Sequence, residues 1–279
     1  MKKIIAAIDA VNFSAKQLQH FNSWSTQANG KLVAVFLENI AGEPIEYLGA
    51  LPSDVAPLYA ELNWQHIDDR RKIISEKIKL FDDTCEVLKI NASLHEDEKM
   101  PLEEIVRESR FADLLLIENN LSFNKLFESD PPRFVKEVLR ESQCPVLLLP
   151  SEKKDVKELF FAYNGTASSM YAIRSFTNLF NDYTNKPVTI LFVDEHKKGV
   201  IPDEKLLKEY MQCHYKNWTT TIINGDEPAF ELMSFLMNKS NYLITLGAYG
   251  RSNISQFFRK SDANKLLAML NTNIFITHP

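Results

Sequence analysis

Short apolar runs alternate with longer amphipathic stretches along the whole chain. The short runs are rich in Ile, Val, Leu and Phe, which is typical of buried strands. The longer stretches carry apolar residues at helical spacing. This alternation predicts an α/β fold, in which parallel strands are joined by crossover helices.

In the first half, strands are expected at Lys3–Ile8, Leu32–Leu37, Glu86–Ile90, Asp113–Ile117 and Pro145–Leu149. Helices are expected there at Ser14–Ala28, around Leu58–Phe81, at Leu102–Ser109 and at Phe134–Glu141. In the second half, strands are expected at Leu159–Tyr163, Val188–Val193, Thr219–Ile223, Tyr242–Leu246 and Ile274–Thr277. Its helices are expected near Ser168–Asn181, Asp203–Lys216, Ala229–Asn238 and Asp262–Leu270.

The second half repeats the first in register as well as in order. A shift of 128 residues places the stretch that begins at Asp113 on the stretch that begins at Asn241. Nearer the start of each half, a shift of 155 residues places Ala7 on Ala162. Self-similarity of this kind indicates two copies of one structural unit.

We therefore predict two Rossmann-like domains, 1–150 and 155–279, each a five-stranded parallel sheet flanked by helices. The boundary falls in the polar, charged stretch Ser151–Glu158. A tandem chain of this kind would pair its two halves within one molecule. The segment Glu38–Pro57, with several prolines and glycines, is expected to be a loop before a long helix. Whether it is a lid, a contact surface or a tolerated insertion stays open.

Composition narrows the class of protein. Apolar residues make up 45% of the chain, charged residues 25%, and the formal net charge is −5. An acidic balance without a basic run argues against a nucleic-acid-binding protein. The apolar run at the N-terminus is interrupted at Asp9, too early for a signal peptide, and no run is long enough to span a membrane. The three cysteines are far apart and form no ligand motif. These features predict a soluble, cytoplasmic protein.

The stretch LGAYGRS, Leu246 to Ser252, carries the clearest binding signal. It follows a buried strand, and ligands of open parallel sheets bind beyond the carboxyl ends of strands. Gly247 and Gly250 could bring backbone N–H groups close to a phosphate, although a tight turn alone also explains them. Ser261 is placed to cap the next helix, whose N-terminus would favour an anion.

These features together resemble the universal stress protein family, whose loop reads G-x2-G-x9-G-[S/T]. In its ATP-binding members this loop folds around the phosphates, and an Asp at the end of the first strand contacts the nucleoside. Gly247, Gly250 and Ser261 match the loop, and Arg251 lies within it. Asn164 holds the place of the Asp, followed by Gly165 and Thr166. The stretch INGDEP, Ile223 to Pro228, resembles the family's segment beside adenine. The resemblance implies an adenine-nucleotide-hydrolase-like fold and adenine nucleotide, such as ATP, as ligand.

Two departures bear on that expectation. Lys260 stands where the third glycine of the loop would be, and it could either bind a phosphate or block the approach. Asn164 keeps the hydrogen-bonding ability of the Asp but not its charge. The family resemblance further implies that the halves pair through their last strands, Val146–Leu149 and Ile274–Thr277. Further dimerisation stays open.

The first half has lost the loop. Asn119 and Ser122 replace the two glycines, and Pro132 and Arg133 replace the Lys–Ser pair. Proline offers no N–H, and Glu118 adds negative charge nearby. We expect no phosphate there, and Asp9 is expected to form a local turn rather than a ligand contact.

Other candidates for chemistry weigh less. The run His95–Glu98 (HEDE) is expected to be a solvated acidic loop rather than a metal site, because successive loop residues rarely converge on one ion. No motif of nucleophilic catalysis occurs, so no catalytic residue and no metal ligand is assigned.

The sequence supports two functions almost equally. The first is adenine-nucleotide binding in the second domain without efficient turnover, in a protein that is not an enzyme in the ordinary sense, although slow ATP hydrolysis stays open. The second is a stress-response module that binds no nucleotide and acts through protein contacts or another small ligand. An ATP-consuming enzyme is the least supported, because the sequence shows neither a catalytic carboxylate pair nor metal-binding acids.

Overall fold

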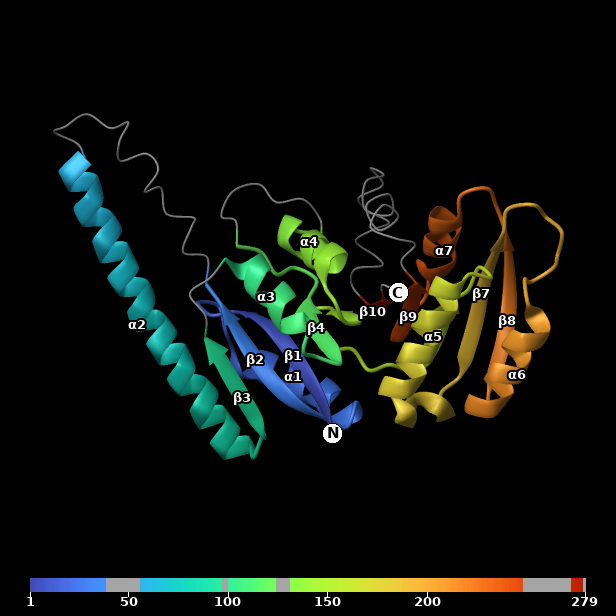
Figure 1. Ribbon diagram of the computed structural model, residues 1–279, viewed down its shortest axis with the longest axis horizontal. Coiled ribbons are helices and arrows are strands. Elements are labelled where there is room, and N and C mark those ends of the chain that lie inside the picture. The colour runs from blue at the N-terminus through green and yellow to red at the C-terminus, as the bar shows by residue number, and fades with distance from the viewer. Residues whose placement is uncertain (39–55, 97–99, 124–130, 248–271, 278–279) are drawn as a thin grey trace.

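A computed structural model describes residues 1–38, 56–96, 100–123, 131–247 and 272–277 (Figure 1). All helices, strands and contacts of the fold given for this chain lie within these residues. Strands and helices alternate, as the sequence pattern predicts. None of the described helices is both long and apolar enough to cross a lipid bilayer.

The first half contains five strands and four helices in simple alternation along the chain. They are β1 (Lys2–Asp9), α1 (Ala15–Gln27), β2 (Gly30–Leu37), α2 (Ala56–Leu88), β3 (Ala92–Glu96), α3 (Pro101–Ser109), β4 (Leu114–Glu118), α4 (Arg133–Glu141) and β5 (Val146–Leu149).

The described part of the second half repeats this order. It comprises β6 (Glu158–Ala162), α5 (Ala167–Leu179), the short 3₁₀ helix η3 (Asn181–Asn185), β7 (Val188–Asp194), α6 (Glu204–His214), β8 (Trp218–Asn224), α7 (Pro228–Leu236), β9 (Tyr242–Gly247) and β10 (Asn273–Thr277). The expected helix at Asp262–Leu270 lies outside the described residues.

All ten strands form one continuous sheet, in the order β3-β2-β1-β4-β5-β10-β9-β6-β7-β8. Each half therefore runs outward from the centre in the same order, and pairing within each half is parallel. The halves join where β5 and β10 pair antiparallel, with Phe275 opposite Leu147. This is the contact expected between the two last strands.

Helices cover both faces of the sheet. On one face, α1, α2, α5 and α6 pack around a core that includes Phe36, Phe161 and Phe275. On the other face, α3, α4 and α7 pack around a core that includes Ile117 and Ile244. Because each core extends across both halves, the burial of apolar surface also stabilises the junction between them.

Aromatic rings on the first face strengthen the junction. Trp24 of α1 lies edge-on to Phe180 at 5.6 Å between ring centroids and is stacked on Tyr183 at 6.0 Å. Lys2 donates hydrogen bonds to the carbonyl oxygens of Asn178 and Leu179 at the end of α5. Contacts of this kind add to the burial energy, by about 1 kcal/mol for an aromatic pair.

The third strand of the first half is not where the sequence pattern places it. Residues Glu86–Leu88 belong to the last turn of α2, and β3 begins at Ala92. The apolar residues Val87 and Ile90 lie at the end of a helix rather than in a strand. Lys89 has a φ of 53°, the left-handed conformation that terminates helices, and the N–H of Ile90 donates to the carbonyl oxygen of Cys85. The end of a helix and a short strand can contain similar proportions of apolar residues, so the spacing of apolar residues alone does not distinguish them.

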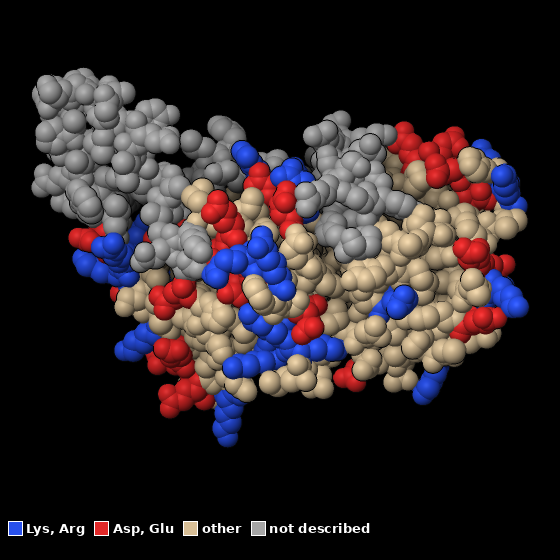
Figure 2. Space-filling view, in the orientation of Figure 1, with Lys and Arg blue, Asp and Glu red and all other residues tan. Residues whose placement is uncertain are grey.

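Acidic and basic side chains intermingle on the face shown in Figure 2. On that face the basic side chains gather mainly over the first half, with acidic side chains beside them.

Candidate functional site

The turn from β6 into α5 holds three of the predicted site residues. The Oδ1 atom of Asn164 accepts hydrogen bonds from the backbone N–H of Thr166 (3.3 Å) and from its hydroxyl (2.8 Å). Thr166 is the N-cap of α5, and its side chain accepts from the N–H of Ser169 (3.4 Å). Between them Gly165 has a φ of 81°, which favours glycine. The side-chain oxygen of Asn164 is thus already used by the turn that starts the helix.

Gly247, at the end of β9, lies directly against the first turn of α5. A Cβ at this position would come within 2.4 Å of the carbonyl oxygen of Ser168 and 2.6 Å of the nitrogen of Ser169. Both are backbone atoms, so no side-chain movement could relieve the contact. The glycine is required because it allows the helix to approach the strand end this closely.

The fold therefore brings the two predicted segments of the second half together. β6 and β9 are neighbours, with Phe161 opposite Thr245, so their carboxyl ends meet at one edge. INGDEP comprises the last two residues of β8 and the turn into α7, on the same edge but beyond β7 and therefore farther from Asn164. Gly250, Arg251, Lys260 and Ser261 lie outside the described residues, so the phosphate loop stays a sequence prediction.

Asp9 in the first half forms a local turn, as expected. Its Oδ1 accepts hydrogen bonds from the backbone N–H groups of Val11 (2.9 Å) and Asn12 (3.4 Å), and its Oδ2 accepts from the Asn12 amide (2.7 Å). The following N-cap, Ser14, lies five residues beyond Asp9, whereas Thr166 lies two beyond Asn164. The first turn of α1 is thus reached by a longer connection than that of α5.

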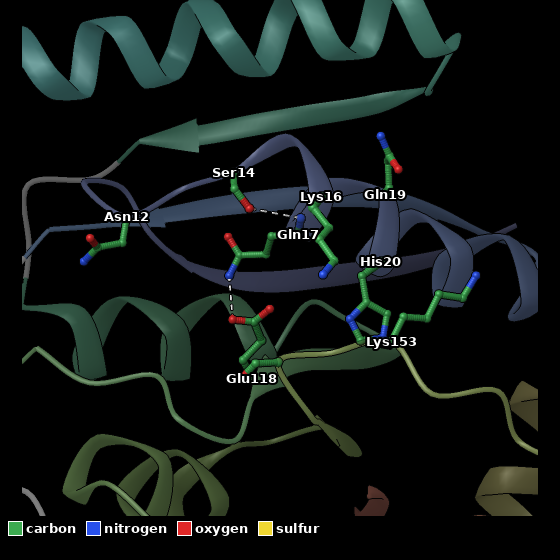
Figure 3. Close-up of a pocket in the computed structure, with 9 residues that line it drawn as sticks. Asn12, Ser14, Lys16, Gln17, Gln19, His20, Glu118 and Lys153 are labelled. Atoms are coloured by element: carbon green, nitrogen blue, oxygen red, sulfur yellow. Dashed lines mark hydrogen bonds between the residues drawn. The ribbon is translucent and has the colours of Figure 1, made fainter. Parts of the chain in front are cut away.

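A cavity of about 350 Å³ lies at this edge of the first half (Figure 3). Its walls come from the β1–α1 connection, from α1, from the end of β4 and from the linker after β5. Its polar lining includes Ser14, Lys16, Gln17, His20, Glu118 and Lys153. None of them is predicted from the sequence to contact a ligand.

Gln17 and Glu118 connect α1 to β4 across the cavity. The Nε2 of Gln17 donates to Oε2 of Glu118 at 2.9 Å. Burial raises the pKa of the Glu118 carboxyl, and the hydrogen bond from Gln17 only partly offsets that rise. The Oε1 atom of Gln17 is buried with no hydrogen-bond partner among the described residues.

His20 is the most deeply buried of these polar side chains, with 4% of its surface exposed. Neither ring nitrogen has a hydrogen-bond partner within the described part of the chain. Burial, together with the nearby charges of Lys153 and Lys16, lowers the pKa of His20 to about 4. One signal in the sequence could have revealed the pair: Gln17 and His20 are polar and lie one turn apart beside the apolar positions Leu18 and Phe21 of a helix that packs on the sheet.

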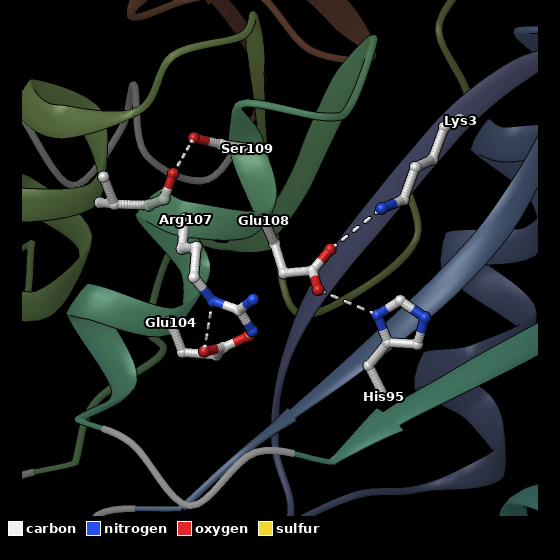
Figure 4. A network of polar contacts seen from close by, with 7 residues as sticks. Lys3, His95, Glu104, Arg107, Glu108 and Ser109 are labelled. Carbon is white, nitrogen blue, oxygen red and sulfur yellow. Dashed lines mark hydrogen bonds and ion pairs between the residues drawn. The ribbon is translucent and has the colours of Figure 1, made fainter.

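A second polar network ties β1, β3 and α3 together (Figure 4). Glu108 accepts from Nζ of Lys3 and contacts Nδ1 of His95, both at 3.0 Å. Burial would raise the pKa of Glu108, but the hydrogen bonds and charges of Lys3 and His95 hold it below its usual value.

His95, the first residue of HEDE, is thus engaged in structure, and Glu96 ends β3. Asp97 and Glu98 lie outside the described residues. Among those that are described, no group of three or more His, Cys, Asp or Glu could hold a metal ion.

Comparison with known proteins identifies the fold. No protein-family model matches the sequence, and no curated protein matches it. Solved structures do match. A universal stress protein from Archaeoglobus fulgidus DSM 4304 has a TM-score of 0.70 and 14% identity, covering 99% of this chain and 96% of that chain.

Two proteins of Pseudomonas aeruginosa are more distant. One, from strain UCBPP-PA14 and described as a universal stress protein, has a TM-score of 0.53 and 12% identity, covering 100% of this chain and 94% of that one. A functionally unknown protein from strain PAO1 has a TM-score of 0.51 and 12% identity, with 100% and 93% covered. The chain therefore has the universal stress protein fold over essentially its full length. At these identities the likeness establishes fold, and site chemistry has to be argued from the residues.

Proposed function

We propose that this chain is a universal-stress-type protein that binds an adenine nucleotide at the carboxyl edge of its second half, without efficient turnover. In this proposal the nucleoside lies near Asn164, and the phosphates lie on the loop that runs from Gly247 through Gly250 and Arg251 to Lys260 and Ser261. The protein would act as a stress-response binding module in the cytoplasm, with the two halves associated as a pseudo-dimer and a homodimer as a further option.

The contact of Gly247 with the first turn of α5 is the observation that supports this proposal most directly. It joins the strand end that leads into the predicted loop to the turn formed by Asn164, Gly165 and Thr166. Two segments that the family resemblance assigns to one site are therefore neighbours in the fold, which supports a shared ligand. Anions are favoured there, because the first N–H groups of α5 have no intrahelical partners.

A second function, without nucleotide, is favoured by a different observation. The side-chain oxygen of Asn164 already accepts a hydrogen bond from the Thr166 hydroxyl, so it is less available to a nucleoside than a free carboxylate would be. Lys260, which stands in place of the third loop glycine, also favours a function without nucleotide. A protein of this kind would act through protein contacts or through another small ligand.

A thermal-shift titration with ATP, ADP and AMP, with and without magnesium, separates the two functions. A ligand that binds only the native state stabilises it by about 2.7 kcal/mol at a hundredfold excess over its Kd. We expect a saturable shift with ATP that Gly250→Val abolishes. No shift at millimolar nucleotide would leave only the second function.

The Lys260→Gly variant tests whether the lysine obstructs the loop or binds a phosphate. Tighter ATP binding by this variant would show that the lysine obstructs the loop, and weaker binding that it holds a phosphate. Ser122→Val, at the position of the first half that corresponds to Gly250, is the matched control for Gly250→Val and should leave ATP binding unchanged. Following phosphate release in the same samples tests the expected lack of efficient turnover.

A further inference from the structure

The cavity of the first half has the construction of a binding site that is separate from the predicted nucleotide loop. It lies beside the N-terminal turn of α1 and is bounded on its other sides by the end of β4 and by the linker. Figure 3 shows Gln17 and His20 projecting from α1 on the side that faces Glu118 and Lys153. At about 350 Å³, the cavity is at the lower end of the range found for small-molecule sites.

Its buried polar atoms lack partners. A neutral histidine ring offers one donor and one acceptor, and in His20 both nitrogens are buried and unpaired among the described residues. Gln17 adds a buried acceptor, Oε1, in the same condition. Each such atom costs about 1–3 kcal/mol when it is left without a hydrogen bond. A ligand that supplies both a donor and an acceptor would recover part of this cost.

The charges around the cavity select the kind of ligand. Lys16 and Lys153 are exposed and line it, and both act on His20 strongly enough to disfavour its protonation. The first N–H groups of α1 add positive potential, because a helix N-terminus lacks intrahelical acceptors. Glu118, whose negative charge argues against an anion directly at the end of β4, contributes instead an acceptor for a donor group of the ligand, so the anionic group belongs on the side of the two lysines. An anionic group near the lysines and a hydroxyl near Gln17 and Glu118 would satisfy both sides.

We propose that this cavity binds a small hydroxylated organic anion, held by Lys16 and Lys153 at its charged group and by Gln17 and His20 at its hydroxyl end. The site uses none of the residues of the predicted nucleotide loop. It therefore goes beyond the proposed function, and each site can fail without the other.

The imidazole signals of His20 report on the cavity directly, and NMR can follow them in the full chain. Two probes distinguish the source of the anionic group: citrate, a hydroxycarboxylate, and glycerol 3-phosphate, a phosphorylated polyol. Glycerol at equal concentration and sodium chloride at equal ionic strength are the neutral and salt controls. We expect a saturable shift of the His20 signals with at least one anion and a rise in the pKa of His20, because a bound anion offsets the two lysines.

Lys153→Gln should weaken that binding about tenfold, as expected when one charged hydrogen bond is lost. Its matched control is Lys157→Gln, an exposed lysine of the same linker that does not line the cavity, and this variant should bind normally. The Lys153→Gln variant should keep the full thermal shift with ATP, which Gly250→Val is expected to abolish. The two sites can therefore be distinguished.

His20→Leu, followed by calorimetry because the reporter is lost, should remove anion binding without unfolding the protein. Binding of citrate alone would assign a carboxylate ligand, and binding of glycerol 3-phosphate alone a phosphate ligand. The proposal is overturned if neither anion perturbs His20 saturably at millimolar concentration. It is equally overturned if glycerol or salt reproduces the effect, or if Lys157→Gln weakens binding as much as Lys153→Gln does.

Discussion

The carboxyl edges of the two halves consist of corresponding strands and helices, but the gap between helix and strand is closed differently in each. In the second half the first turn of α5 lies against Gly247 of β9, backbone on backbone. In the first half the corresponding gap between α1 and β4 is bridged by two side chains, Gln17 and Glu118, and a cavity remains beside them. The shift of 128 residues that relates these strands places Asn119 where the second half has Gly247. One glycine and a shorter turn therefore determine whether this edge of the sheet is closed by a helix or left open.

The largest effect is expected from removing the glycine that allows the close approach. Gly247→Ala places a Cβ within 2.4 Å of a backbone oxygen of α5, so the helix or the strand must move. We expect a loss of about 3 kcal/mol in the free energy of unfolding, measured by urea denaturation. The comparison residue Asn119 already carries a side chain, so Asn119→Ala should cost about 1 kcal/mol or less. Equal losses in the two variants would contradict the account of the two edges.

A smaller loss should follow from Gly165→Ala, in the short turn that leads into α5. Its φ of 81° strains any residue with a Cβ, and the added atom would come within 2.5 Å of the Cβ of Pro202. We expect a cost of about 2 kcal/mol in the same urea assay. Gly199→Ala separates the two causes: its φ is 66° but nothing lies within 4 Å, so it should show the strain alone, about 1 kcal/mol.

The smallest effect concerns pH and the open edge. His20 has a pKa of about 4 in the folded protein, whereas an unfolded chain protonates histidine below about 6.5. Between these values the unfolded state binds more protons, so stability falls as pH falls through this window, by about 1.2 kcal/mol at pH 5.5 relative to pH 7. His20→Leu should remove that loss, as seen in melting curves between pH 7 and 5.5. His196→Gln, at an exposed histidine, should leave the pH dependence as it is in the parent protein.

Much of the fold can be predicted from the sequence, because buried parallel strands are short, continuous apolar runs. The strands around Ile5, Leu115, Leu147 and Ile190 were all correctly predicted for that reason. β3 was misplaced since its residues are only partly buried and its alternating pattern is weak, while the end of α2 is apolar. The junction of β5 with β10 followed from the family resemblance rather than from any local pattern.

The open edge could not be predicted in the same way. Gln17 and His20 are noticeable in the sequence only as polar residues beside the apolar positions of a helix, and their lack of partners depends on the distance between α1 and β4. That distance is set by Gln17 meeting Glu118 and by the longer connection between Asp9 and Ser14, which only the packed structure shows. In the second half, sequence motifs identified Asn164 and Gly247 but not the hydrogen bond that occupies the Asn164 side chain.

The antiparallel pairing of β5 with β10 has a consequence for assembly. Because both strands belong to one chain, their encounter is intramolecular, with an effective local concentration in the millimolar range that dilution does not change. A pair of separate subunits joined through the same strands would dissociate as the protein is diluted, and its stability would depend on mass action. In this chain the central seam should persist at any expression level, so a change in cellular abundance alters the number of molecules but not their architecture.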